Sequence, residues 1–276
     1  MRGLHRQEVA AGRALGSPRS IVATLAVMCA PLSSGIARAE HDMAAMSAHH
    51  AHEGSELSAG VAVEAAQFDT MAYVGSYQGI TPSIGWMRGR FGAGATLGLY
   101  HLNKNGLSLY GIGDAMFTGH ATVWATETVQ TGLALHLMAP TGSELDGLGM
   151  GHVMATPSAW ASWRRDRLSL WASAGYSWAL TGGAGQHNHG PSPLVDPMNM
   201  QEVTWSAGGD LDVAHGIRVG AHAQGGIPTG VGSDRVIGAG RVAWGTPRVS
   251  TAFELQLGLA GDPFTIRGVV ETALRF

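Results

Sequence analysis

FTIRGVVETALRF, residues 264–276, is the stretch of this sequence that decides its fold class. One alternate set of residues is apolar or small: Phe264, Ile266, Gly268, Val270, Thr272, Leu274 and Phe276. The other set carries the charges: Thr265, Arg267, Val269, Glu271, Ala273 and Arg275. Successive side chains of a β-strand point to opposite faces. The alternation therefore predicts a strand with one face against lipid and the other against a hydrated interior.

Four further segments repeat this alternation: 167–178, 203–213, 217–224 and 249–259. Each combines an apolar face with a face of Ser, Thr, Gln, His or charged residues. Strands of soluble proteins average about 5–6 residues, whereas strands that cross a membrane need about 9–11. Most of these segments have the longer size. They favour membrane-spanning strands over the half-buried strands of a soluble sandwich.

The connections between the predicted strands alternate in length. Tight turns are expected near 164–166, 215–216 and 246–247, whereas the long connections are 139–153, 181–201 and 226–234. The connection at 262–263 is an exception, because it is short although its place in the alternation puts it with the long connections. Membrane barrels have short periplasmic turns and longer outer loops in alternation. With about five more strands expected in 71–138, the prediction is an all-β, antiparallel, up-and-down transmembrane β-barrel of about twelve strands.

The composition excludes two other classes of protein. Of the 276 residues, 41 are Gly, and 13% are charged. Soluble domains average about 7% Gly and about 25% charged residues. A membrane helix needs about 18 or more apolar residues in a row, and no segment of the sequence approaches this. Few charges without a long apolar run are typical of a barrel, in which alternation dilutes the apolar residues.

The first 39 residues have the pattern of a signal peptide. Residues 1–20 are rich in Arg, residues 21–32 are apolar but too short to span a bilayer, and Ala37-Arg38-Ala39 is a small-residue cleavage pattern. The alternative is a short buried helix. We expect cleavage near Ala39, export, and a final location in a Gram-negative type of outer membrane. Cys29 is the only cysteine and lies in this segment, so we expect no disulfide in the mature chain.

Charge gives no reason to expect a nucleic-acid partner. The sequence has 17 basic and 20 acidic residues, and residues 1–39 contain five Arg and Glu8, which leaves 12 basic and 19 acidic residues and a net charge of −7. Nucleic-acid binding needs a basic surface. The expected partners are instead outer-membrane lipid, the assembly machinery and small-molecule solutes. The C-terminal aromatic Phe276 after alternating apolar residues is the predicted assembly signal.

Aromatic residues near the predicted strand ends indicate interfacial girdles, as membrane barrels have. The alternative is that they are scattered core aromatics. They are Trp86, Tyr100, Trp160, Trp163, Tyr176, Trp178, Trp205 and Trp244.

Residues 110–180 resemble a known family. The matching stretches are Tyr110–Ala115 (YGIGDA), Gly132–Leu135 leading to Pro140-Thr141-Gly142, Gly147–Gly151 and Pro157–Trp160, and a second Pro-Thr-Gly is at 228–230. They resemble outer-membrane transporters of the phenol-degradation meta-pathway type. The sequence departs from that type in its compressed stretch 115–131 and its His-rich arm. The resemblance implies a barrel in the outer membrane, and it assigns no binding residue.

Residues 40–69 are expected to form a flexible, His/Met-rich periplasmic arm, followed by the barrel at 70–276. Imidazole and thioether groups together suit copper, and imidazole also suits zinc. The alternative is a solvated tail and a solvated loop. The candidate metal ligands are His41, Met43, Met46, His49, His50 and His52 in the arm, and His187 and His189 in the long loop 181–201.

The polar faces of the predicted strands supply candidate lumen-lining residues. His136 and His222 are interpreted as lining rather than as metal ligands. No sequence pattern of an enzyme is present, so the chain is predicted not to be one. The leading hypothesis is a channel or transporter for small solutes, and the alternatives are a copper-handling envelope protein and a purely structural barrel. The lining candidates are Arg167, Asp210, Asp212, Arg218, His222, Arg241, Glu254, Arg267, Glu271 and Arg275.

Overall fold

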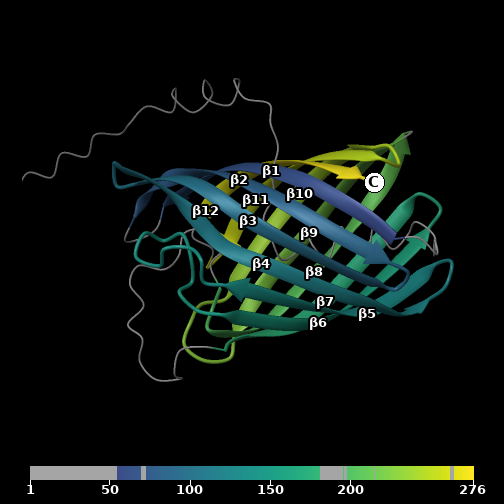
Figure 1. The fold of residues 1–276 in the computed structure, drawn as a ribbon, viewed down its shortest axis with the longest axis horizontal. Helices are drawn as coiled ribbons and strands as arrows, with labels where there is room; N and C mark the ends of the chain where they lie inside the picture. The colour runs from purple at the N-terminus through teal and green to yellow at the C-terminus, as the bar shows by residue number, and fades with distance from the viewer. Residues whose placement is uncertain (1–54, 70–72, 181–194, 196–197, 215, 262–263) are drawn as a thin grey trace, which may run out of the picture.

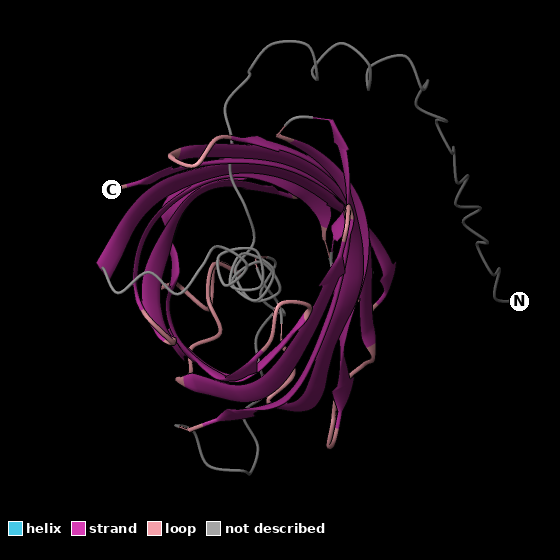
Figure 2. Ribbon diagram, turned by 90° about the vertical axis from the view of Figure 1, so that its right-hand side faces the viewer, coloured by secondary structure: helices cyan, strands magenta, loops and turns pink. Residues whose placement is uncertain are grey.

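Twelve strands close into a single antiparallel barrel (Figures 1 and 2). The computed structural model describes residues 55–69, 73–180, 195, 198–214, 216–261 and 264–276. Each strand pairs with its neighbours in sequence, and β1 pairs with β12. Among the described residues, no helix is long and apolar enough to cross a membrane. The strands are β1 Ser55–Asp69, β2 Val74–Arg88, β3 Phe91–Lys104, β4 Leu107–Ala125, β5 Val129–Ala139, β6 Met154–Arg165, β7 Leu168–Ala179, β8 Gln201–Ala214, β9 Ile217–Pro228, β10 Arg235–Gly245, β11 Val249–Ala260 and β12 Phe264–Arg275.

The predicted fold class and strand number are confirmed, but the predicted start of the barrel is wrong. The arm was expected to extend to residue 69, whereas residues 55–69 form β1, which pairs with β2 and β12 along its length. The region 71–138 holds β2, β3, β4 and most of β5 rather than five strands, because β4 alone has 19 residues. The two errors cancel in the total.

Alternation along the strands separates an inner and an outer face. On β11, Ala252, Glu254 and Gln256 are buried, whereas Phe253 and Leu255 between them are exposed. The same alternation runs through β7 and β8, where the sequence predicted it. Because the barrel is closed, the buried face of each strand is the face toward the interior (Figure 2). Apolar side chains therefore cover the outside of the barrel.

The connections divide the barrel into a short-turn end and a long-loop end. At the short-turn end the connections are 89–90, 126–128, 166–167, 215–216 and 246–248. The connections 140–153, 180–200 and 229–234 all lie at the long-loop end. This alternation is the one predicted from the sequence. It places the start of β1 and the end of β12 together at the short-turn end, where Phe276 N donates to Leu57 O at 2.8 Å.

One inward–outward assignment on β12 is wrong. Phe264 was expected on the outer face, but it is 2% exposed and lies inside the barrel. The cause is a register shift opposite Gln67 and Phe68, since Gln67 pairs with Ile266 while Phe68 pairs with Phe264. Thr265 is the extra residue. A bulge of this kind reverses the facing of every residue beyond it.

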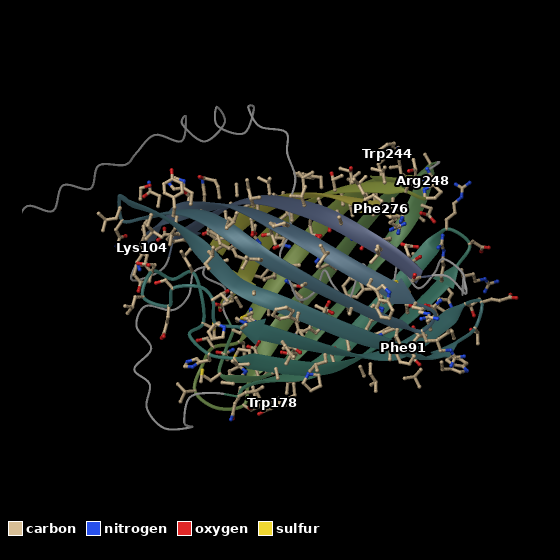
Figure 3. All side chains as sticks on the ribbon, in the orientation of Figure 1. Phe91, Lys104, Trp178, Trp244, Arg248 and Phe276 are labelled. Carbon is tan, nitrogen blue, oxygen red and sulfur yellow. The ribbon has the colours of Figure 1, made fainter. Side chains whose placement is uncertain are left out.

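Several aromatic side chains on the outer surface lie at the strand ends, whereas Phe117 and Phe253 lie in the middle of β4 and β11. Figure 3 shows Phe91, Trp244 and Phe276 at the short-turn end, and these side chains are 62%, 51% and 75% exposed. Two of the aromatics expected in such girdles lie inside the barrel instead: Tyr100 is 7% exposed and Trp160 is 6% exposed. For Tyr100 and Trp160, the alternative interpretation as core aromatics is therefore the correct one.

Candidate functional site in the barrel interior

A buried arginine, Arg267 on β12, organises the polar part of the interior, and it is 2% exposed. Its Nε donates to Gln256 Oε1 at 2.7 Å, and its Nη1 donates to Tyr77 Oη at 3.2 Å. The same Nη1 lies 3.6 Å from Glu64 Oε2, and the guanidinium carbon lies 4.3 Å from the centre of the Phe264 ring. Arg267 therefore ties together β1, β2, β11 and β12, where the barrel closes.

The polar contacts continue from Arg267 around the wall. Gln256 Nε2 donates to Glu254 Oε1, and His222 Nε2 lies 3.7 Å from the same oxygen. The His222 ring in turn lies 5.7 Å from the ring of Trp171. These side chains come from six strands between β7 and β2. We name them the polar belt: Glu64, Tyr77, Trp171, His222, Glu254, Gln256 and Arg267.

The polar belt holds charge in a buried environment. Glu64 is 1% exposed and Glu254 is 5% exposed. Burying an isolated charge costs several kcal/mol, and a cation at close range with further hydrogen bonds offsets this cost. Arg267 supplies the cation beside Glu64, and Gln256, which accepts a hydrogen bond from Arg267, donates one to Glu254. The interior is therefore built around paired charges and differs in kind from the apolar exterior.

Nearer the long-loop end, one part of the interior is an apolar cluster. Leu148 from the connection 140–153 and Val195 from the connection 180–200 are 2% and 5% exposed. They pack with side chains of β1, β2, β3, β10 and β12. Seen end on, loop segments lie within the ring of strands (Figure 2). We name this set the mouth cluster: Ala66, Phe68, Tyr77, Tyr100, Leu102, Leu148, Val195, Ile237 and Phe264.

Side-chain hydrogen bonds fasten the connection 140–153, of which residues 147–150 are buried, to β4. Thr141 Oγ1 donates to Gly113 O at 2.7 Å and accepts from Ala115 N at 2.8 Å. Asp114 accepts from Gly142 N at 2.9 Å and from Met150 N at 2.6 Å. The stretches that carry the family resemblance, 110–115 and 140–142, therefore contact each other. Their role in this structure is to fix the loop that places Leu148.

A second group of contacts fastens the loops to one another. Glu202 is fully buried, and its Oε1 accepts from Arg235 Nη2 at 2.6 Å. Its Oε2 accepts from Asn199 Nδ2 at 2.6 Å, and Asn199 Nδ2 also donates to Ser233 O at 3.2 Å. These contacts join the end of the connection 180–200 to the connection 229–234. The loops over the lumen thus form one connected set.

Nine of the ten residues predicted to line the lumen lie on inward positions of the strands, and six of these lie away from the short-turn end. Three of these six are 7% exposed or less, and the other three are partly buried. In order along the chain they are Asp210, His222, Arg241, Glu254, Arg267 and Glu271. Three of the six, His222, Glu254 and Arg267, belong to the polar belt.

The other four predicted residues lie at the short-turn end. Arg218 Nε is 3.6 Å from Asp212 Oδ1, and Arg275 Nε is 3.7 Å from Glu56 Oε1. These are partly exposed ion pairs at the rim. Arg167 lies in the turn between β6 and β7, outside the strand to which the sequence analysis assigned it.

The candidate metal ligands in the arm and in the loop 181–201 lie outside the described residues, as does the predicted signal peptide. The affected ligands are His41, Met43, Met46, His49, His50, His52, His187 and His189. Within the described ranges, no group of three or more His, Cys, Asp or Glu side chains is placed to hold a metal ion.

Several interior residues were missed by sequence reasoning. Glu64 and Phe68 fell within the predicted arm, although Ala62, Glu64, Ala66 and Phe68 occupy alternate positions there. That alternation was the available signal. For Leu148 the sequence offered no comparable signal, because a loop residue carries no strand periodicity.

Comparison with known proteins shows the fold. No protein-family model and no curated protein matches this sequence. The structure is similar to an outer membrane channel from Pseudomonas putida F1, with a TM-score of 0.60 at 12% identity over 82% of this chain and 96% of that chain. It is also similar to the KdgM porin, with a TM-score of 0.52 at 10% identity over 79% of this chain and 99% of that chain. Similarity at such low identity establishes a shared barrel architecture and transfers no residue roles.

Proposed function

We propose that this protein is an outer-membrane channel for small solutes. The observation that carries the proposal is the inverted polarity of the barrel wall. Buried inward positions hold Glu64, Glu254 and Arg267, while outward positions hold large apolar side chains such as Ile84 and Leu99, which are 68% and 48% exposed. In water this arrangement is unfavourable. In a bilayer the outer side chains meet lipid, and the inner ones face a hydrated passage.

The number of strands supports a narrow passage. Barrels of about eight strands are filled by their own side chains, whereas barrels of about 16–18 strands leave an open aqueous channel. The twelve strands here lie between these limits. The mouth cluster and the polar belt occupy the space that such a barrel encloses. We infer a path that narrows at the mouth cluster and again at the polar belt, and that therefore suits small solutes.

The order of the two levels suggests the class of solute. On the side of the mouth cluster, a solute that enters from the long-loop end meets aromatic and aliphatic side chains first and then the charged groups of the polar belt. This order favours a small molecule with an apolar or aromatic body and one polar group. The resemblance to transporters of the phenol-degradation meta-pathway type is consistent with that class, which remains part of this proposal.

Conductance in planar lipid bilayers tests the channel, and uptake of small aromatic solutes by proteoliposomes tests the solute class. We expect discrete channel events and uptake above that of protein-free vesicles. If correctly folded protein gives no channel events and no uptake, the proposal is refuted and the hypothesis of a purely structural barrel remains. Uptake of sugars but not of aromatic solutes would refute the solute class alone.

A matched pair of loop variants links the measurement to the site. Leu148 and Leu145 lie in the same connection, but Leu148 is 2% exposed and Leu145 is 80% exposed. Replacing Leu148 by Ser weakens the mouth cluster, so we expect Leu148→Ser to raise conductance. Leu145→Ser is expected to leave it unchanged. Equal conductance in the two variants would show that the mouth cluster does not limit passage.

The copper-handling alternative depends on the His/Met-rich residues before the barrel. Its test is calorimetric titration of copper into the mature chain and into a shortened chain. Because β1 begins at Ser55, the deletion has to end at residue 54 so that the barrel stays whole. Equal heats for the two chains would remove this alternative.

A further inference from the structure

Five methionines gather in one buried cluster beside the long-loop ends of β5 and β6 and the middle of β4. Their side chains are between 1% and 9% exposed, and Ala179 packs against them as a partly buried apolar side chain. All buried methionines of the described residues belong to this group. We name it the thioether cluster: Met116, Met138, Met150, Met154 and Met198.

Strand register brings three of these side chains together. Met116 on β4 pairs with Met138 on β5, and Met138 pairs with Met154 on β6. Directly opposed residues of antiparallel strands have Cβ atoms about 4.5–5.5 Å apart. The three methionines therefore form one row on the inner wall. Their thioether groups, at the ends of flexible side chains, can converge on a single point.

Two loop residues complete the cluster from the side of the lumen. Met150 is held where its backbone N donates to Asp114 Oδ2 at 2.6 Å. Met198 precedes Asn199, whose backbone N and side-chain Nδ2 both donate to Glu202 Oε2, at 3.2 Å and 2.6 Å. Specific polar contacts thus fix the backbone beside each loop methionine. The row and the two loop residues come from five separate parts of the chain.

Packing alone is a poor explanation of this composition. Methionine is a useful filler of irregular gaps, but a well-defined core favours Leu, Ile, Val and Phe. The mouth cluster, at the same end of the barrel, follows that rule and contains no methionine. Buried aliphatic and aromatic residues therefore form the mouth cluster, and the buried methionines form the thioether cluster. Only the thioether cluster concentrates sulfur.

We propose that the thioether cluster binds Cu(I). Thioether sulfur is a soft ligand that selects Cu(I), whereas hard cations such as Mg²⁺ and Ca²⁺ prefer oxygen. His136 is buried two residues before Met138 on the same inward face, which makes its imidazole a candidate for a further ligand. The carboxylate of Asp114 lies two residues from Met116 and offsets the charge of a bound cation. This site is separate from the His/Met-rich arm and does not depend on the proposed solute channel.

Titration with Ag(I), a redox-stable probe of Cu(I) sites, tests the proposal on the full mature chain. The test variant is Met138→Leu with Met154→Leu, and the control is Met87→Leu with Met200→Leu, two methionines outside the cluster. Met to Leu preserves volume and costs less than about 1.5 kcal/mol per site. We expect the wild type and the control to bind one more equivalent of Ag(I) than the test variant, since the arm contributes equally to all three. Equal stoichiometry and affinity in all three proteins would overturn the proposal.

A measurement on the unaltered protein covers the case in which the test variant fails to fold. With ¹³C-methyl-labelled methionine, NMR spectra in micelles report each thioether directly. Ag(I) is expected to shift the methyl signals of the thioether cluster and to leave the signal of Met87 in place. Shifts confined to Met43 and Met46 of the arm would contradict a site in the barrel. Conductance recorded without metal serves as a separate readout for the channel.

Discussion

Replacing Arg267 by methionine removes the cation of the polar belt and keeps a long, flexible side chain in its place. Glu64 then stays at 1% exposure without its guanidinium neighbour. Gln256 and Tyr77 lose the donor that now lies at 2.7 Å and 3.2 Å. The variant thus combines a stranded carboxylate with two altered hydrogen-bond partners, all within the region where β1 and β12 close the barrel.

The size of the effect follows from the burial of both charges. Removing one partner of a buried ion pair costs about 3–5 kcal/mol. The separation of 3.6 Å between Arg267 Nη1 and Glu64 Oε2 is longer than in a close pair, so we expect the lower end, about 3 kcal/mol. Adding Glu64→Gln removes the stranded charge. The double variant should therefore recover about 1–3 kcal/mol relative to the sum of the single variants.

Reversible unfolding in lipid vesicles, followed by the fluorescence of the eight tryptophans, measures these free energies. Arg275→Met is the control, because Arg275 and its partner Glu56 are 21% and 47% exposed at the rim. Such an exposed pair contributes about 0–1 kcal/mol. The reasoning fails if Arg267→Met costs no more than Arg275→Met, or if the double variant shows no coupling between Arg267 and Glu64.

Three further outcomes follow from the same structure. Asp114→Ala removes two hydrogen bonds to a carboxylate, each contributing about 1.5–3 kcal/mol. Limited proteolysis within 140–153 should therefore be faster in the variant. Cleavage at the wild-type rate would contradict the conclusion that Asp114 fixes this loop. Leu255→Arg, on the outer face at the middle of β11, should destabilise the barrel in vesicles by about 2–4 kcal/mol. Leu259→Arg, near the end of the same strand, should cost only about 0–1 kcal/mol. Equal costs for the two variants would contradict a bilayer around the barrel. Phe276→Ala should lower the fraction of heat-modifiable, assembled protein in cell envelopes, and an unchanged fraction would show that Phe276 is not an assembly signal.

Alternation predicted β7, β8, β9, β11 and β12 because their two faces differ in polarity. It failed at β1, where Ala62 and Ala66 on the inner face resemble Ala59 and Ala65 on the outer face, so the contrast between faces is small. Upstream, the two-residue turn at Asn105-Gly106, both with positive φ, was an overlooked signal for the end of β3.

The interior was predictable only one strand at a time. Alternation placed Arg267 and Glu254 on inner faces, yet the contact between Arg267 and Tyr77 spans 190 residues and depends on closure of the barrel. The bulge that turns Phe264 inward depends on the pairing of β12 with β1. The burial of Leu148 depends in the same way on a distant residue, Asp114, which fastens the loop. Sequence periodicity reports which face a residue occupies and carries no information about which residues meet across the lumen.

Two residues of the mouth cluster contact Arg267 of the polar belt, and these contacts link the two levels of the interior. Tyr77 packs in the mouth cluster, while its hydroxyl accepts a hydrogen bond from Arg267. Phe264 packs in the same cluster, and its ring lies under the Arg267 guanidinium. A solute that displaces Leu148 disturbs the cluster containing both rings and so reaches the group that balances Glu64. We therefore expect opening of the mouth and rearrangement of the polar belt to be coupled, so that a variant that loosens either level alters passage through the other.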